Sequence, residues 1–423
     1  MICARLDQVT PALRRYVTAD GFSQFGTQVT RVALPLVALL VLDAGPFELG
    51  LLGAAEMIGF LLFGLPAGVW VDRLRRKPIL VTADVLRAVS LASVPVAALF
   101  DALTLAQLYA VAVIVSIGTA FFDVAHMSFL PSIVTKEQLP KGMGTLESVR
   151  SLAGLFGPGL GGWLVQVLTA PIAIVADAVS YLISAVLLAS VKAEETPAGG
   201  RVSLMEGLRY VLGHPILRLV GLVGAMNMFV SGIWAIVRPL YLVDELGVGA
   251  AAYGLMISGA GVGGLLGAFV AARVIARFGH GPTMFGAAAL MLPLFVLVAF
   301  TGPGWRLALY PIGMALISLV AVLHNVAQGS YRQAICPEAL RGRMNASLRF
   351  LMWGSLPLGG VVGGLLGEAV TVHQLLWIGS LGSVVANLPF VLVPAVRKLK
   401  ITDDGGRGST AARAPASPPR SAR

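Results

Sequence analysis

Long apolar stretches separated by short polar segments run along almost the whole chain. Each stretch is close to the roughly 20 residues that an α-helix needs to cross a bilayer. The twelve stretches cover about residues 20–42, 47–71, 78–100, 103–129, 142–167, 171–191, 215–242, 251–276, 283–301, 306–330, 344–370 and 373–397. The pattern predicts an all-α polytopic membrane protein with twelve transmembrane helices.

The composition excludes several classes of protein. Hydrophobic residues make up 57% of the chain and charged residues only 12%, and the mean hydropathy is +0.84. A water-soluble enzyme cannot cover so much apolar surface, and a disordered chain or a disulfide scaffold has a different composition. The two cysteines, Cys3 and Cys336, lack the spacing of a disulfide framework or a zinc site.

The net charge of +10 could suggest nucleic-acid binding, but the placement of the charges indicates topology instead. With the N-terminus inside the cell, 27 of the 31 Lys and Arg residues fall on the cytoplasmic side. This asymmetry is the positive-inside rule. It predicts a multi-pass protein of the cytoplasmic membrane with both termini cytoplasmic, a lipid bilayer as its surroundings and no nucleic-acid partner.

The chain reads as two similar halves, at residues 1–191 and 215–397. Ser148-Val-Arg150 is echoed by Ser347-Leu-Arg349, and Asp123-Val-Ala125 by Asn325-Val-Ala327. Such order predicts two pseudo-symmetric six-helix bundles. Between them, residues 192–214 form a cytoplasmic loop, in which a capping box from Ser203 to Glu206 predicts a short amphipathic helix on the inner membrane surface. Residues 398–423 are expected to form a disordered cytoplasmic tail.

Glycines spaced four apart mark several of the spans. They are Gly64 and Gly68, Gly157 and Gly161, Gly259, Gly263 and Gly267, and Gly359, Gly363 and Gly367. Small residues on one helix face let backbones approach closely in a membrane. We expect most of these glycines to serve general helix packing and some of them to lie where the two halves meet.

Signatures of enzymes and nucleotide-binding proteins are missing from the sequence. It contains no G-x-x-x-x-G-K-[ST], H-E-x-x-H or G-x-S-x-G, and no Cys/His cluster. We therefore expect no enzymatic activity, no cofactor and no bound metal. Energy for uphill transport would come from an ion gradient.

Two motifs carry a resemblance to a known family. The segment from Gly68 to Lys77, with Asp72, Arg73 and Arg76, resembles the G-x-x-x-D-R-x-G-R-R signature of the major facilitator superfamily, although Arg75 replaces the second glycine. Gly157-Pro158, followed by Gly161-Gly162, is similar to the antiporter motif of the same superfamily.

Three further stretches resemble the drug and siderophore exporter branch of this superfamily, which includes macrolide-efflux and enterobactin-exporter-like proteins. They are Phe121–Ala125, Val175–Tyr181 and Arg341–Phe350. The resemblance extends over about residues 15–400. It implies a twelve-helix transporter whose cavity is lined by spans 1, 4, 7 and 10.

The loop after span 2 predicts a cytoplasmic gate. Asp72 can face the N-terminus of span 11, where the helix dipole favours an anion. Arg73 or Arg76 can pair with Asp123 near the inner end of span 4. Together with Gly68, these residues would hold the two halves together on the cytoplasmic side.

Ionisable residues within spans are expensive to bury and are candidates for proton coupling. They are Glu56, Asp84 and Asp177. Asp84 lies three residues before Arg87, which favours an internal ion pair. Glu56 and Asp177 have no partner nearby in the sequence. Each either exchanges protons or bonds a neighbouring helix, and the structural interpretation is the favoured one.

Polar side chains on the spans expected to line the cavity suggest the substrate class. They are Gln24, Gln28 and Arg31 in span 1, Asn227, Ser231, Trp234 and Arg238 in span 7, and Asn325 and Gln328 in span 10. A few amides, one indole and some arginines in an apolar cavity suit an amphipathic organic molecule. The same amides could instead bond between helices. His324 is interpreted as a packed histidine.

The sequence thus predicts a monomeric secondary transporter that exports amphipathic drug- or siderophore-like molecules by proton antiport with alternating access. One alternative is a proton symporter or facilitator for uptake of a small organic solute. A membrane-embedded enzyme or a receptor is disfavoured, because no catalytic constellation and no output domain is present.

Overall fold

The computed structural model describes residues 11–64, 70–71, 74–135, 137–191, 204–337, 340–397 and 399. Within these residues the fold is helical and contains no strand. Gly68, Asp72, Arg73, Cys3 and Ser203, and nearly all of the predicted tail, lie outside the described residues.

Twelve helices of the described chain are long and apolar enough to cross a membrane, which confirms the predicted number. They are α2 (Pro11–Val41), α3 (Pro46–Phe63), α5 (Arg76–Leu99), α6 (Leu105–Phe129), α7 (Leu139–Leu168), α8 (Ala170–Ser190), α10 (Pro215–Pro239), α11 (Ala250–Phe278), α12 (His280–Ala299), α13 (Leu309–Ile335), α14 (Arg341–Ala369) and α15 (Val372–Leu392). Shorter elements are η1 (Leu130–Ser132), α9 (Leu204–Gly213), η2 (Leu240–Glu245), η3 (Gly304–Ala308) and α16 (Pro394–Arg397).

The largest difference from the predicted spans is at the start of the chain. Helix α2 begins at Pro11 rather than near residue 20. Arg14 and Arg15 lower the local hydropathy there, so the apolar pattern stops before the helix does. The extra turns bring Tyr16 into the helix, where its side chain is buried.

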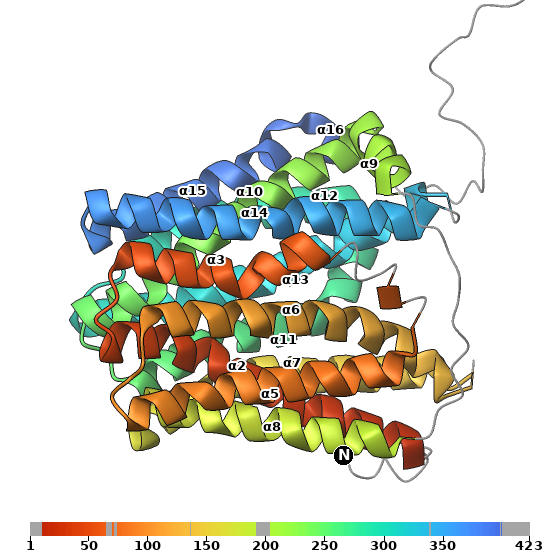
Figure 1. The fold of residues 1–423 in the computed structure, drawn as a ribbon. Helices are drawn as coiled ribbons and strands as arrows, with labels where there is room; N and C mark the ends of the chain where they lie inside the picture. The colour runs from red at the N-terminus through yellow and green to blue at the C-terminus, as the bar shows by residue number, and fades with distance from the viewer. Residues whose placement is uncertain are drawn as a thin grey trace, which may run out of the picture.

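The helices lie side by side and their ends form two faces (Figure 1). We call the face that holds Pro11, Ser190, Leu204 and Arg397 the terminal face. The opposite face carries the short connections between α2 and α3, α5 and α6, α7 and α8, α11 and η2, α12 and α13, and α14 and α15. We call it the loop face.

Helix neighbours fall into two groups along the chain. In the first group α2 packs on α7 and α8, α5 on α6 and α8, and α3 on α6. In the second group α10 packs on α14 and α15, α13 on α11 and α12, and α12 on α15. The two groups, which we call the first and second halves, meet chiefly through α3 with α14 and α7 with α11.

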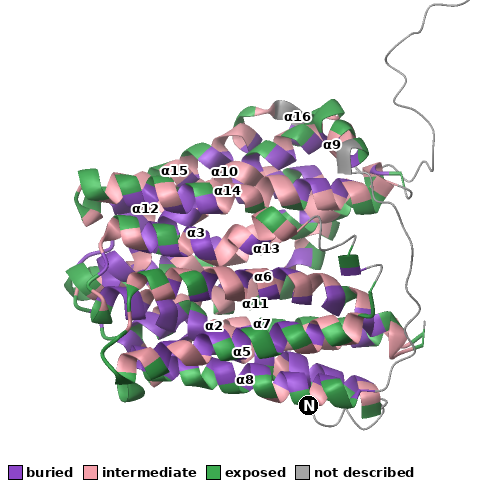
Figure 2. Ribbon diagram, in the orientation of Figure 1, coloured by how far each residue is buried: buried purple, intermediate pink, exposed green. Residues whose placement is uncertain are grey.

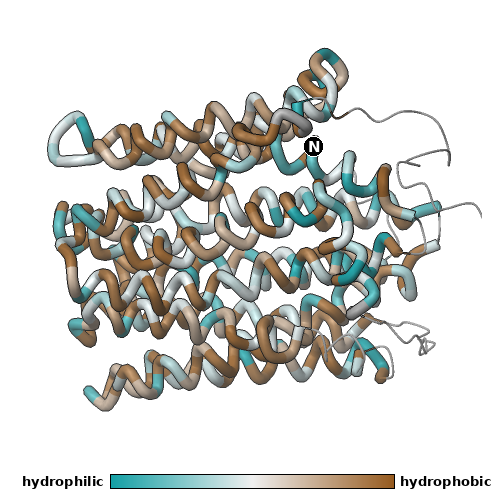
Figure 3. Tube along the Cα trace, turned by 90° about the horizontal axis from the view of Figure 1, so that it is seen from above, coloured by the Kyte–Doolittle hydropathy of each residue, from teal (hydrophilic) through white to brown (hydrophobic). Residues whose placement is uncertain are grey.

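Much of the outer surface is apolar, as a lipid-facing protein requires. Ribbon segments of exposed residues lie on the outside of the bundle in Figure 2, and hydrophobic residues run along the helices in Figure 3. Phe100 and Trp305, both 78% exposed, lie at the loop face. Aromatic residues are favoured at the boundary between lipid and water.

The two halves approach most closely near the loop face. A Cβ on Gly162 of α7 would collide with the backbone of Ala250 and Gly254 of α11. A Cβ on Gly50 of α3 would collide with the backbone of α14 at Gly360. Glycine at these positions therefore permits backbone contact between the halves.

The predicted glycine stripes pack mainly within their own halves. Gly263 and Gly267 of α11 face α13, and Gly359 and Gly363 of α14 face α10. Gly157 and Gly161 likewise face α2. General helix packing thus explains most of these stripes, and Gly50, Gly254 and Gly360 at the junction lie outside them.

The short helix predicted in the central segment is present as α9. Its Val211 is fully buried and packs with residues of α10 and α14. Its Glu206 forms an ion pair with Arg343 of α14. The apolar side of α9 therefore contacts the second half of the protein.

Candidate functional site

A polar cavity of about 320 Å³ lies among the helices of the first half and is completed by α14. Its lining residues are Ser23, Gln24, Thr27, Gln28, Thr30, Arg31, Glu56, Met57, Phe60, Arg87, Thr119, Phe122, Asp123, Arg150, Asp177, Arg349 and Trp353. Of the four spans expected to line it, the first (α2) and the fourth (α6) do so. We call this space the polar cavity.

Helix α2 lines the polar cavity with the residues that the sequence singled out. Gln24, Gln28 and Arg31 lie on one face of the helix, and all three line the cavity. The Cβ and Cγ of Gln28 lie against Gly157 of α7. The Gln24 amide donates a hydrogen bond to Asp20 Oδ1 (3.3 Å).

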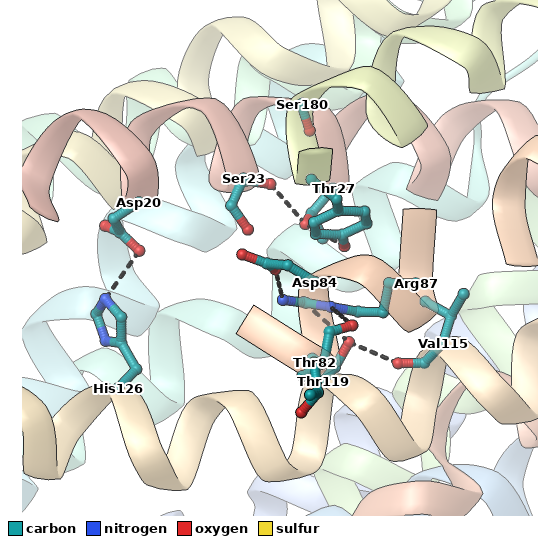
Figure 4. Close-up of polar contacts among 12 residues, drawn as sticks. Asp20, Ser23, Thr27, Thr82, Asp84, Arg87, Val115, Thr119, His126 and Ser180 are labelled. Carbon is teal, nitrogen blue, oxygen red and sulfur yellow. Dashed lines mark hydrogen bonds and ion pairs between the residues drawn. The ribbon is translucent and has the colours of Figure 1, made fainter. Parts of the chain in front are cut away.

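Asp84 and Arg87 of α5 form the predicted ion pair (Figure 4). The exposed fraction of Asp84 is 0% and that of Arg87 is 2%. The guanidinium lies 4.4 Å from the ring centre of Phe122 and 4.1 Å from that of Tyr181. Aromatic faces stabilise a cation away from water, so Arg87 is held between α6 and α8.

The carboxylate of Asp177, on α8, accepts hydrogen bonds from Thr30 (2.5 Å) and Ser180 (3.0 Å). The side chain is fully buried and also lines the polar cavity. Asp177 therefore joins α8 to α2, which is the interhelical role that the sequence left open. The same side chain also contacts the polar cavity.

Glu56 enters the polar cavity from α3. The guanidinium of Arg31, across the cavity on α2, interacts electrostatically with its carboxyl group. The sequence offered no local partner for Glu56, because this one comes from another helix.

The residues predicted on α10 have structural roles in the second half. Asn227 exchanges amide hydrogen bonds with Asn387 of α15, at 3.4 and 3.0 Å. Ser231 donates to the Asn227 carbonyl (2.8 Å). The indole of Trp234 is buried and donates to Ser383 (3.2 Å). The contacts of Asn227 and Trp234 are the interhelical bonds that the sequence left as the alternative, and none of the three residues lines the polar cavity.

The remaining predicted residues of the second half also lie away from the polar cavity. Arg238 interacts with the buried Tyr310. On α13, Asn325 is exposed and Gln328 is partly buried. His324 is packed, as expected, with Nδ1 3.2 Å from the Met284 carbonyl oxygen and its ring edge-on to Phe390.

The predicted gate is only partly within the described residues. Arg76 opens α5, and Asp123 lines the polar cavity. The structure places Arg349 of α14 near Asp123, with Nη2 and Oδ2 3.9 Å apart. This contact joins the two halves on the terminal side of the cavity, with an arginine that the gate prediction did not name.

The antiporter motif places α7 between the two halves. Gly157 and Gly161 face Gln28 and Val29 of α2. Pro158 and Gly162 meet Gly254 of α11 on the other side. The motif thus connects a cavity-lining helix to the junction at the loop face.

A second, mainly apolar pocket of about 280 Å³ adjoins the polar cavity. It lies between α3, α6 and α14 and is lined by Phe60, Leu61, Gly64, Ala120, Val124, Asn345, Ala346, Arg349, Phe350, Trp353 and Gly354. Phe60, Arg349 and Trp353 line both spaces. We call it the aromatic pocket.

The sequence reasoning missed several lining residues. Arg150 and Arg349 stand at equivalent positions of the echoed segments, and this repetition was the available signal. Phe122 and Trp353 carry no signal beyond an aromatic side chain in an apolar span. Among the described residues, no group of three or more His, Cys, Asp or Glu side chains could hold a metal ion.

Comparison with known proteins supports a transporter. The chain is 26% identical over 397 residues to the multidrug efflux pump Tap of Mycolicibacterium fortuitum, covering 89% of this chain and 94% of that one. It is 24% identical over 392 residues to macrolide efflux protein A of Streptococcus pyogenes, covering 88% and 94%. These relatives agree with the exporter branch indicated by the motifs.

A solved structure with the same fold is a bacterial homologue of the iron transporter ferroportin in its inward-facing state. It has a TM-score of 0.73 at 18% identity and covers 90% of this chain and 98% of that one. The family model described as Major Facilitator Superfamily matches residues 19–353. The chain therefore belongs to the Major Facilitator Superfamily, as a multi-pass membrane transporter and not an enzyme.

Proposed function

We propose that this protein exports amphipathic, drug-like small molecules across the cytoplasmic membrane by proton antiport with alternating access. One observation carries the proposal: a charged, polar cavity adjoins an aromatic pocket inside the bundle. A molecule with a polar group and an apolar body can place one part in each space.

The residues shared by the two spaces define the substrate class. Phe60 and Trp353 provide flat apolar surfaces, and their ring centres lie 5.9 Å apart. The guanidinium carbon of Arg349 lies 5.8 Å from each ring. This arrangement suits an aromatic or macrocyclic body next to a polar group better than it suits a sugar, which would need a denser set of hydrogen-bonding groups.

The relatives favour export as the direction of transport, since Tap is named a multidrug efflux pump and the streptococcal protein a macrolide efflux protein. The lysines and arginines, concentrated at the terminal face, favour a cytoplasmic location for that face and for both termini. The siderophore-like substrates of the same branch remain within the proposed class.

The contacts between the halves support alternating access. At the loop face, the Phe47 amide donates to Glu368 (3.2 Å), and Gly162 meets Gly254. On the terminal side, Asp123 and Arg349 provide a long contact of 3.9 Å. In the proposed topology this conformation is closed to the outside, and transport requires the loop-face contacts to break.

Glu56 and Asp177 are the proposed proton-coupling carboxyls of the polar cavity. Both lie at a depth where an ionised carboxylate needs a partner, here Arg31 for Glu56 and hydroxyl groups for Asp177. Binding of a proton or of a substrate would change the interactions of these two carboxyl groups with their partners. The proton gradient would then be the energy source, without a cofactor.

The test is accumulation of a fluorescent amphipathic dye in an efflux-deficient bacterium that expresses the chain, with and without a protonophore. We expect lower accumulation that the protonophore abolishes. Glu56→Gln, at equal amounts in the membrane, should abolish the difference. Higher accumulation than in cells without the protein would instead favour the alternative, an uptake symporter or facilitator.

A further inference from the structure

Asp20 of α2 and His126 of α6 form a buried acid–base pair beside the polar cavity (Figure 4). His126 Nε2 lies 3.1 Å from Asp20 Oδ1. The exposed fractions of Asp20 and His126 are 3% and 4%. Neither residue is required by the substrate-binding argument above. Burying ionisable side chains within membrane-spanning helices is costly, which makes this pair a candidate for a function.

Aromatic packing fixes the orientation of the imidazole. The rings of Tyr16 and Phe122 stack on it, with centre distances of 4.9 and 5.5 Å and interplanar angles of 25° and 26°. The Tyr16 hydroxyl also donates to the His126 carbonyl oxygen (2.8 Å). Stacked aromatic rings stabilise a positively charged imidazole, and Nε2 lies next to the carboxylate.

The pair has a route to the surface through a further pocket, which shares Arg150 with the polar cavity. Asp20 and His126 line a pocket of about 150 Å³ between α2, α6, η1 and α7, together with Glu147 and Arg150. Glu147 and Arg150 are exposed. The pocket therefore joins a buried proton-binding pair to a charged, solvent-accessible rim near the terminal face.

Titratable and charged groups near the pair come from three helices. Tyr16 lies on α2, Asp84 with its partner Arg87 on α5, and Glu147 and Arg150 on α7. Asp84 interacts electrostatically with His126. Because Asp84 and Arg87 neutralise each other, the charge of the Asp20–His126 pair is decided mainly by its own proton.

We propose that the Asp20–His126 pair is the station that binds and releases the transported proton on the terminal side of the protein. The inference rests on the proposed proton antiport and deepens it. Without the proton, a neutral imidazole and a carboxylate carry a net charge of −1. With it, an imidazolium and a carboxylate carry a net charge of 0.

The net charge connects the station to the substrate. The uncharged, proton-loaded pair can be enclosed in the protein, whereas the charged pair is stabilised by contact with water and the Arg150 rim. Gln24 donates to the same carboxylate oxygen of Asp20 and also lines the polar cavity. When the pair binds a proton, the imidazolium competes for the carboxylate of Asp20, and the hydrogen bond from Gln24 becomes weaker. Gln24 can then change its position in the lining of the polar cavity.

The first test does not depend on the substrate. The chain contains five histidines, so ring-¹⁵N-labelled histidine in lipid nanodiscs gives few signals, and the one lost in His126→Gln is assigned to His126. We expect this signal to titrate and its midpoint to move in Asp20→Asn. An imidazole that keeps one protonation state over the whole range in which the protein is folded would overturn the proposal.

The second test separates proton coupling from substrate movement in proteoliposomes with radiolabelled erythromycin, a macrolide. We expect His126→Gln to lose accumulation driven by a pH gradient but to keep exchange of labelled for unlabelled erythromycin. The matched control is His324→Gln, which replaces a buried histidine without a carboxylate partner and should keep both activities.

The outcomes distinguish this inference from the proposed function. Wild-type protein without gradient-driven accumulation or exchange would count against the proposed function, and the titration would still decide whether the pair binds a proton. Gradient-driven accumulation by His126→Gln at the wild-type level would overturn the inference alone. Loss of exchange together with accumulation would assign the pair a structural role and overturn it as well.

Discussion

Replacing Asp84 by Asn tests whether the buried ion pair in α5 is essential to the stability of the first half. The substitution keeps the shape of the side chain but removes its charge, so Arg87 loses the carboxylate with which it forms its ion pair. At a charge separation of about 4 Å and an effective dielectric constant of about 20, the lost attraction is about 4 kcal/mol. Breaking a buried pair by removing one partner typically costs about 3–5 kcal/mol.

The substitution leaves the other contacts of Arg87 in place. The rings of Phe122 and Tyr181 contact the guanidinium in the wild type and in the variant, so they do not change the difference between the two. We therefore expect Asp84→Asn to lower the free energy of unfolding by about 3–5 kcal/mol. Denaturation by SDS in mixed micelles measures it, and Asp101→Asn, at an exposed site on the loop face, is the control.

The double variant Asp84→Asn with Arg87→Met gives the sharper result. It removes both charges, so no uncompensated ion stays in the apolar interior, and it should be more stable than the single variant. A single variant as stable as wild type, or a double variant less stable than the single one, would refute this account of the pair.

Three further predictions concern the junction, the surface and the second half. Gly162→Ala should slow dye export at unchanged membrane levels, because the added Cβ meets the backbone of α11. The control Gly154→Ala adds a Cβ that meets no neighbouring atom and should match wild type. Equal export rates for the two variants would contradict the close contact. Arg343→Ala removes the ion pair with Glu206; the exposed fractions of the two side chains are 33% for Arg343 and 53% for Glu206. The free energy of unfolding in SDS should therefore fall by less than about 1 kcal/mol. A larger loss would contradict the treatment of this pair as a solvent-screened surface contact. Trp234→Phe should cost about 1 kcal/mol of stability through its lost hydrogen bond and leave the KM for an exported dye unchanged, while an altered KM would place the indole at the substrate.

Helix existence and number could be predicted from the sequence because the free energy of placing a span in lipid is nearly additive along it. The Asp84–Arg87 pair was predictable for a similar reason, since residues three apart on a helix are neighbours whatever the helix packs against. The boundaries were less certain where charged residues such as Arg14 and Arg15 belong to a helix that extends beyond the apolar stretch.

The partners of polar side chains on different helices could not be predicted in this way. Asn227 and Gln28 look alike as single amides in apolar spans, yet Asn227 bonds to Asn387 and Gln28 lines the polar cavity. The deciding quantity is the rotation of each helix about its axis, and that depends on how all the side chains of its neighbours pack.

Local runs of residues were enough to predict twelve apolar helices of membrane-spanning length and to identify motifs of the major facilitator superfamily, because neither property depends on contacts between distant residues. Three features came from the folded arrangement alone: Arg349 lies near Asp123, Asp20 lies next to His126, and the polar cavity lies mainly in the first half. These contacts join residues far apart in the chain. Their geometry is set by close packing between helices, where a shift of a few tenths of an ångström already decides whether a side chain fits.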